Sequence, residues 1–178
     1  MEATGQAAGQ LTGPVEVRPA RAGDIPGMTD LWGLMMAEHR ALDPRLRFAA
    51  GAPQAAARQM RGSLRDRDTA LLVAEAAGRV VGYVLAYRQQ RPPVAPLGDF
   101  AFVAELFVHP EFRRAGVGTR LVRAAMEALR GRGARSFELL ASHANAAAVG
   151  FWRSLGFSDY MLLLRADLPG ADGEGDRP

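Results

Sequence analysis

Hydrophobic and polar positions along this chain follow two periods, which predict strands in some segments and helices in others. Residues 15–18 alternate as a first strand, and residues 100–108 (FAFVAELFV) are nearly all apolar, as in a strand buried on both faces. Two further apolar runs, 70–75 and 80–87, are joined by a short turn and predict a hairpin. The sheet is therefore expected to begin with antiparallel strands.

Apolar residues recur every three or four positions in four other stretches, which indicates helices. The predicted helices span residues 24–39, 53–64, 119–129 and 145–155. The remaining strands are expected at 136–141 and at 157–167, the latter as one strand or a pair. Strands that come first as a hairpin and later alternate with helices predict an α/β (α+β) fold with a mixed sheet covered by helices.

The length of 178 residues fits one domain. Residues 1–13 are rich in Gly, Ala, Gln and Thr and are predicted to be a disordered lead without a signal-peptide pattern. Residues 169–178 are acidic and rich in Gly, which predicts a disordered tail. The folded domain is accordingly expected at 14–168.

The chain contains no cysteine, which excludes disulfides, thiolate metal sites and a cysteine nucleophile. No metal site is predicted. The lack of cysteine suits a reducing compartment, and no apolar run approaches the roughly 20 residues that span a membrane, so a cytoplasmic protein is expected.

All 22 basic residues are arginine, and they are scattered along the chain. The isoelectric point of about 10.1 therefore reflects the high pKa of arginine more than the formal charge of +3. Without a run of basic residues, neither a nucleic acid nor a membrane is an expected partner.

The turn from Arg113 to Gly118 is the strongest candidate for chemistry. It follows an apolar strand and opens a helix, so free backbone N–H groups converge there, and glycine allows a ligand to approach closely. Arg113 and Arg114 add positive charge, which indicates a pyrophosphate-bearing cofactor. The alternative is an ordinary strand-to-helix turn. The turn matches neither the G-x-G-x-x-G dinucleotide fingerprint nor a Walker loop.

A second motif lies in the stretch 145–157. Asn145 is suited to cap a helix and Gly156 to end it, and on this basis alone the segment is a capped helix with a buried apolar face.

Together the two motifs resemble those of the GNAT superfamily of N-acetyltransferases. The family's first signature, [Q/R]-x-x-G-x-[G/A] between a strand and a helix, is met by Arg113, Gly116 and Gly118. Its second signature is met by Asn145, Ala148, Phe151, Gly156 and Phe157. The resemblance covers about residues 15–168 and implies a mixed, mostly antiparallel sheet with a central splayed parallel pair and helices on both faces.

The resemblance also implies acetyl-CoA as co-substrate. It places the pyrophosphate on the turn, and the residues expected there are Arg113, Arg114, Ala115, Gly116, Val117, Gly118 and Thr119. It pairs the pantetheine arm with the main chain of Leu106, Phe107 and Val108, and brings Asn145, Phe151 and Trp152 close to the cofactor. The thioester is then expected in a gap between the strands 100–108 and 136–141.

Glu105 is the candidate catalytic base, because it is the one charged side chain in an apolar strand. Burial raises the pKa of a carboxyl group and suits it to remove a proton from an amine. The alternatives are a carboxylate paired with an arginine and one that orients a cationic substrate. His109 is the second candidate, and Glu38, His39 and His143 are candidates for the acceptor side.

The chain departs from the family at Trp152, where a tyrosine commonly donates a proton to the thiolate of CoA. An indole N–H does not titrate near neutrality, so Trp152 is not a general acid. Tyr83 or Tyr160 would replace it only if the fold brings one close.

These residues predict an N-acetyltransferase that moves an acetyl group directly to an amine on a small molecule or a protein. The alternative is a non-catalytic acyl-CoA-binding module. The sequence does not identify the acceptor, and a homodimer is the default expectation.

Overall fold

The computed structural model describes residues 14–92, 94 and 97–166. The predicted disordered lead at 1–13 and tail at 169–178 lie outside the described residues, and the domain limits at 14 and 168 stay predictions. Within the described part, the strands are β1 (Glu16–Pro19), β2 (Thr69–Ala76), β3 (Arg79–Gln89), β4 (Phe100–Val108) and β5 (Ser136–Leu139). The α-helices are α1 (Ile25–Leu42), α2 (Ala52–Ser63), α3 (Val117–Arg130) and α4 (Ala146–Ser154), and short 3₁₀ turns span Ala22–Asp24 and Pro110–Phe112.

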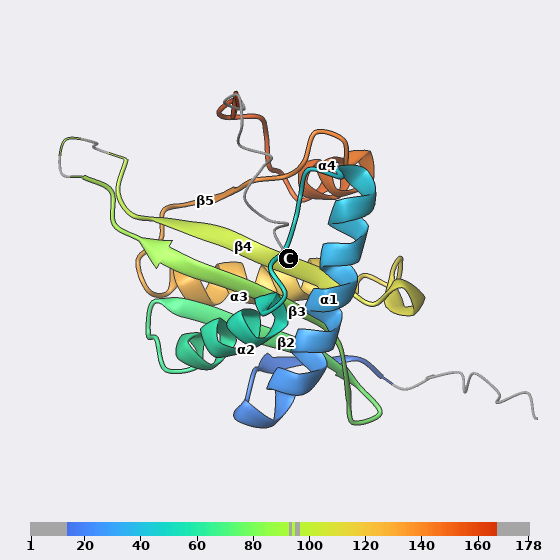
Figure 1. Ribbon diagram of the computed structural model, residues 1–178. Coiled ribbons are helices and arrows are strands. Elements are labelled where there is room, and N and C mark those ends of the chain that lie inside the picture. The colour runs from blue at the N-terminus through green and yellow to red at the C-terminus, as the bar shows by residue number, and fades with distance from the viewer. Residues whose placement is uncertain (1–13, 93, 95–96, 167–178) are drawn as a thin grey trace, which may run out of the picture.

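The five strands form one sheet in the order β1-β2-β3-β4-β5 (Figure 1). The first four strands pair antiparallel with their neighbours, and β5 pairs parallel with β4. The parallel pair arises because the chain crosses from β4 to β5 through α3, as a parallel connection requires. This confirms the predicted fold class, with β5 at one edge of the described sheet.

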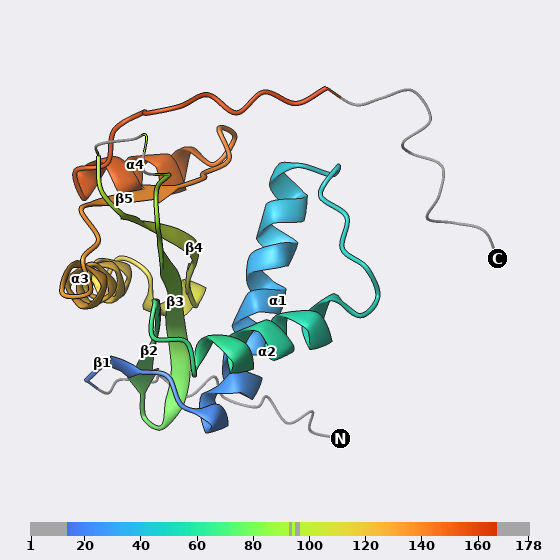
Figure 2. The ribbon, with the colours of Figure 1, turned by 90° about the vertical axis from the view of Figure 1, so that its left-hand side faces the viewer.

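Helices cover both faces of the sheet (Figure 2). On one face, which we call the α3 face, Leu121, Ala125 and Leu129 of α3 pack against alternate residues of the strands. On the other, the α1 face, Met28 and Leu31 of α1 pack on the sheet together with α2. The apolar stripe predicted for the third helix is therefore the one that α3 buries.

The entry into α1 is held by charged groups. Arg18 of β1 donates two hydrogen bonds to the carboxylate of Asp24, of 2.7 and 2.8 Å, and also pairs with Glu75 of β2. The hydrogen bonds from Arg18 lower the pKa of Asp24, which accepts a further bond from the amide of Arg21. This network anchors the start of α1 to the sheet.

The prediction of a strand at 157–167 is wrong for the described residues 157–166, which form no strand. The segment leaves α4 and runs across the end of the molecule (Figure 2). Its apolar sequence favours a strand, but a strand needs a neighbour for its main-chain hydrogen bonds.

None of the described helices is both long and apolar enough to cross a membrane.

Candidate functional site

The gap between β4 and β5 opens where their pairing stops. The two strands pair from Phe100 opposite Ser136 to Val103 opposite Leu139. Beyond these residues β5 ends, whereas β4 continues to Val108 with β3 on its other side. Along residues 104–108 of β4, the main chain on the β5 side therefore faces no strand of the described structure.

A β-bulge in β4 lies at the start of this gap. Glu105 is opposite Leu85 and Val103 is opposite Ala86, so Ala104 is an extra residue without an opposite number on β3. A one-residue insertion moves all the following side chains to the other face of the sheet. Val103 accordingly packs in the core of the α3 face, whereas Phe107 packs in the core of the α1 face.

The bulge turns Glu105 toward the α1 face, where Tyr83 of β3 lies. Tyr83 is fully buried, and its hydroxyl donates a 2.8 Å hydrogen bond to Oε2 of Glu105. Burial raises the pKa of Glu105, and the hydrogen bond from Tyr83 lowers it by a smaller amount. Burial and the neighbouring carboxylate raise the pKa of Tyr83, so its hydroxyl stays protonated. The arrangement gives a carboxyl group of raised pKa, fixed in orientation by a neutral donor.

The glycine turn continues from β4 into α3. Gly116 caps the helix at φ +73°, and Arg114 has φ +66°, so two residues of the turn lie in the left-handed region that favours glycine. No side chain of the described residues accepts a hydrogen bond at this helix end. The first bond within the helix joins the amide of Arg120 to the carbonyl of Gly116, at 3.1 Å. The amides of Val117, Gly118 and Thr119 thus form the kind of uncapped first turn that binds anions.

The side chain of Arg113 points toward α1. Its Nη2 lies 2.6 Å from Oε1 of Glu38, its Nε donates a 2.9 Å bond to the carbonyl of Val108, and its guanidinium lies over the ring of Phe107 at 5.1 Å. Arg113 therefore ties α1 to the end of β4, and its charge is paired with Glu38.

The helix α4 lies beside the turn. Asn145 caps it, its Oδ1 accepting a 3.0 Å bond from the amide of Ala148, as the sequence predicts. A Cβ placed on Gly118 would lie 3.3 Å from Cζ of Phe151, so Gly118 allows α3 and α4 to approach. Trp152 packs edge to face against Phe151 and Phe157, with ring centroids 5.1 and 5.3 Å apart, and joins the core of the α3 face. Its ring is a packing element between α4 and the sheet.

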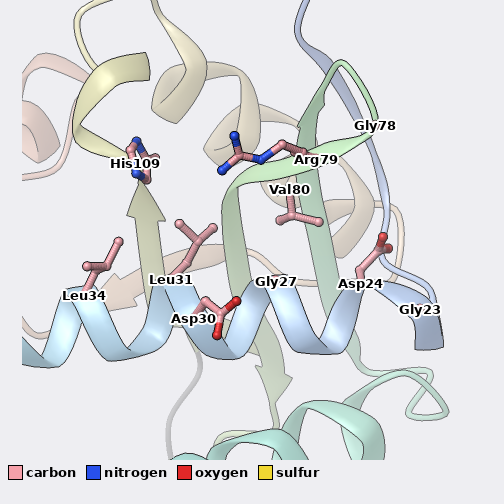
Figure 3. A pocket seen from close by; sticks show the side chains of 10 residues that line it. All are labelled: Gly23, Asp24, Gly27, Asp30, Leu31, Leu34, Gly78, Arg79, Val80 and His109. Atoms are coloured by element: carbon pink, nitrogen blue, oxygen red, sulfur yellow. The ribbon is translucent and has the colours of Figure 1, made fainter. Parts of the chain in front are cut away.

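A hollow of about 360 Å³ lies on the α1 face, between α1, the β2–β3 turn and the end of β4 (Figure 3). The side chain of Arg79 extends over Leu31 in the direction of His109. Nδ1 of His109 is buried, has no hydrogen-bond partner in the described structure, and lies 3.7 Å from Glu111. None of the residues expected to hold the cofactor lines this hollow. The hollow that His109 lines is therefore distinct from the β4–β5 gap.

The remaining candidates are dispersed. Glu38 is engaged with Arg113, His39 lies in the last turn of α1, and His143 is exposed before α4. Tyr160 is exposed on the segment after α4, whereas Tyr83 is the tyrosine that the fold brings to Glu105.

Two features of this site were not identified from the sequence. The bulge at Ala104 leaves no residue-type signal in an apolar run, and the contact of Tyr83 with Glu105 depends on the register of β3 with β4. A carboxylate between apolar residues is a signal that some partner is needed, but it does not say which. Within the described part of the chain, no cluster of three or more His, Asp or Glu side chains is placed to hold a metal ion.

Comparison with known proteins adds to this geometry. The sequence model of the acetyltransferase (GNAT) family matches residues 30–157. An uncharacterized N-acetyltransferase of Methanocaldococcus jannaschii is 35% identical over 53% of this chain and 41% of its own length. An N-alpha-acetyltransferase of Sulfurisphaera tokodaii is 29% identical over 61% of this chain and 68% of its own. The chain thus spans about two fifths of the length of the first relative.

A solved aminoglycoside N-acetyltransferase, AAC(6')-Iy in complex with CoA, has a similar fold. The TM-score is 0.70, the alignment covers 88% of this chain and 96% of that chain, and 18% of residues are identical.

Proposed function

Because the chain belongs to the acetyltransferase (GNAT) family, we propose that it transfers the acetyl group of acetyl-CoA to an amine acceptor in a ternary complex. The observation that carries the proposal is the bulge at Ala104. It coincides with the end of β4–β5 pairing, and it turns Glu105 to the α1 face beside Tyr83. An open strand edge and a carboxyl group of raised pKa are thereby next to each other.

The residues present fit a CoA thioester. The uncapped first turn of α3 offers the amides of Val117, Gly118 and Thr119 to the diphosphate, and the exposed guanidinium of Arg114 adds charge at the same turn. The side chain of Arg113 is paired with Glu38, so its share in this site is its main chain. When bound, acetyl-CoA supplies an acyl group activated as a thioester.

The main chain of residues 106–108 has no strand on its β5 side in the described structure, and it is the surface that we assign to the pantetheine arm. On the same grounds the cofactor would pass Asn145 and Phe151 of α4, with Trp152 behind them as part of the packing. We assign the main chain at the bulge, where Ala104 is the extra residue, as the hydrogen-bond donor to the thioester carbonyl.

Glu105 acts as the base in this proposal. An amine attacks only when it is neutral, and a carboxylate whose pKa is raised by burial accepts a proton from an ammonium group more readily than an ordinary one. Glu105 takes one proton from the ammonium form of the acceptor, directly or through a water, and the neutral amine then attacks the thioester carbonyl. The C–N bond forms, the C–S bond breaks, and a second proton passes from the acylated nitrogen to the CoA thiolate, directly or through a water. In this proposal the thiolate receives its proton without a tyrosine at the position of Trp152. The lack of cysteine agrees with direct transfer without an acylated enzyme.

The second candidate function is an acyl-CoA-binding module without turnover, which the tryptophan at position 152 favours. The packing of Trp152 between Phe151 and Phe157 explains why a tryptophan stands at this position, and this explanation is compatible with catalysis. The two functions differ in one measurable property, the release of free CoA thiol.

The test is acetyl-CoA turnover with a panel of amines, read by thiol release, together with CoA binding by calorimetry. The panel includes aminoglycosides and α-amines such as peptides with a free N-terminus, because one relative is named an N-alpha-acetyltransferase and the structural neighbour an aminoglycoside N-acetyltransferase. We expect thiol release with at least one amine, and loss of CoA binding in Gly118→Glu, which places bulk and negative charge at the turn.

Gly62→Glu is the matched control, because Gly62 is an exposed glycine of α2 with open space around it. CoA binding without thiol release for any amine would favour the binding module. Normal CoA binding by folded Gly118→Glu would refute the assignment of the turn.

A further inference from the structure

The hollow on the α1 face is a cavity that the proposed activity does not use. Its volume of about 360 Å³ lies within the range of about 300–1,000 Å³ that small-molecule sites occupy. Its walls come from α1, from the β2–β3 turn and from His109, the residue after β4 (Figure 3). In the described structure a Cβ on Gly23 or Gly78 would meet no other atom within 4 Å, so glycine leaves these two walls open.

Two charged side chains of opposite sign line this hollow without a partner. Arg79 begins β3 and Asp30 belongs to α1, and neither forms an ion pair or a side-chain hydrogen bond with any other described residue. Asp24 also lines the hollow, but its carboxylate is engaged with Arg18. Figure 3 shows the guanidinium of Arg79 and the carboxylate of Asp30 on opposite sides of Leu31. They do not pair with each other, which leaves room for a ligand between them.

A ligand with a single charge fits these walls poorly. A carboxylate or a phosphate would satisfy Arg79 but leave the negative charge of Asp30 beside it, and a simple amine would do the reverse at Arg79. A small molecule that carries both charges satisfies both side chains at once. The arrangement of charges therefore favours a zwitterion.

Apolar side chains lie between and beside the two charges. Leu31 is buried under the side chain of Arg79. Leu34 also lines the hollow, one helical turn after Asp30, and is 43% exposed. An apolar group of the ligand that covers Leu34 removes this surface from water. The ligand is thus expected to carry an apolar group beside its two charges.

The ring of His109 is fixed at the end of the hollow toward which Arg79 extends (Figure 3). It packs edge to face against Phe112, with ring centroids 6.2 Å apart, and the amide of His109 donates a 2.8 Å bond to the carbonyl of Val81. Nδ1 is buried on the side of Glu111, at 3.7 Å from its carboxylate. Nε2 is therefore the ring nitrogen that can donate a hydrogen bond to a ligand carboxylate beside the guanidinium.

We propose that this hollow binds a free α-amino acid with an apolar side chain, at a site separate from that of acetyl-CoA. The carboxylate of the amino acid pairs with Arg79 and accepts a hydrogen bond from His109. Its ammonium group pairs with Asp30, and its side chain covers Leu34. The inference does not depend on the proposed activity, since none of these four residues belongs to the cofactor site.

The first experiment is calorimetry of the full chain with leucine and three analogues that each lack one feature. Leucinamide lacks the carboxylate, N-acetylleucine lacks the ammonium group, and glycine lacks the apolar side chain. We expect leucine to bind at least about tenfold more tightly than each analogue, because each loses a charged contact or the burial of a leucine side chain.

The second experiment measures leucine binding by variants of the two charged walls. Arg79→Gln and Asp30→Asn should each weaken it by about tenfold or more. Arg123→Gln, at an exposed position of α3, is the matched control and should bind leucine as the wild type does. Since the side chains of Arg79 and Asp30 are exposed, both variants should keep the wild-type circular dichroism and the wild-type affinity for acetyl-CoA.

Three results would overturn the proposal. The first is the absence of saturable heat with leucine, and the second is an affinity for leucinamide or N-acetylleucine equal to that for leucine. The third is wild-type affinity for leucine in Arg79→Gln and Asp30→Asn, which would place the amino acid elsewhere, as it would if leucine bound in the β4–β5 gap as an acetyl acceptor.

Discussion

Glu105→Gln separates the chemical role of this side chain from its structural role. The glutamine keeps an oxygen that accepts the hydrogen bond from Tyr83, which is 2.8 Å long in the wild type, but it has no basic form. We therefore expect the variant to fold and to bind CoA as the wild type does. A positioned general base contributes about 10²- to 10⁴-fold to a rate, so we expect kcat/KM to fall by about two orders of magnitude or more.

The pH dependence carries the sharper test. Because burial raises the pKa of Glu105, the wild-type rate should rise with pH through that raised value, and the variant should lack this limb. The free energy of unfolding of the wild type should, in contrast, fall as the pH rises through the same range. A carboxyl group with a raised pKa in the folded state stabilises the fold below its ordinary pKa and loses this contribution as the pH rises through the raised value.

The size of this stability change follows from the difference between the folded and unfolded pKa of Glu105. A tenfold change in proton affinity corresponds to about 1.4 kcal/mol. Relative to the wild type, Glu105→Gln should therefore gain stability between acidic and neutral pH, by on the order of 1 kcal/mol for each tenfold difference in proton affinity between the folded and unfolded states. Urea unfolding at several pH values measures this gain.

Tyr83→Phe extends the test. The hydrogen bond from Tyr83 lowers the pKa of Glu105, so its removal should move the limb of the rate profile to higher pH. Glu127→Gln, at an exposed position of α3, is the control and should change neither profile. If Glu105→Gln kept the wild-type pH–rate profile, Glu105 would have no part in proton transfer.

Three further predictions concern the frame of the site. Asp24→Asn should lower the free energy of unfolding by about 2–3 kcal/mol at neutral pH, since it breaks the buried contact with Arg18. This loss should shrink in acid, where Asp24 of the wild type becomes protonated. Asp159→Asn, in an exposed ion pair, is the control and should lose less than about 0.5 kcal/mol in the same denaturation assay. Trp152→Tyr and Trp152→Phe should have kcat values within about twofold of each other if the proton reaches the thiol without an acid at this position. A tyrosine variant more than about tenfold faster than the phenylalanine variant would show that the site lacks an acid. Gly116→Ala should reduce stability by about 1 kcal/mol, because φ +73° is strained for alanine, and thermal unfolding that shows no loss would mean that the turn relaxes.

Most elements could be predicted from the sequence because their signals are local. The apolar stripe of α3, the cap at Asn145 and the apolar run of β4 each depend on residues within a few positions of one another. The prediction of a strand at 157–167 was wrong because its signal was also only local. Apolar composition indicates the preference of the segment, but only a neighbouring strand would have satisfied it.

The sequence by itself determined the order of the elements and the family, since the two glycine-containing motifs and the apolar periods are properties of the chain alone. It also identified Glu105 as a charge in an apolar strand. Only the tertiary structure decided which face Glu105 occupies, because one extra residue at Ala104 reverses the alternation that a regular strand would give. The partner Tyr83, the pairing of Arg113 with Glu38 and the uncovered edge of β5 likewise arise from segments that are far apart in the chain. Such contacts depend on sheet register and helix packing, which no local pattern encodes.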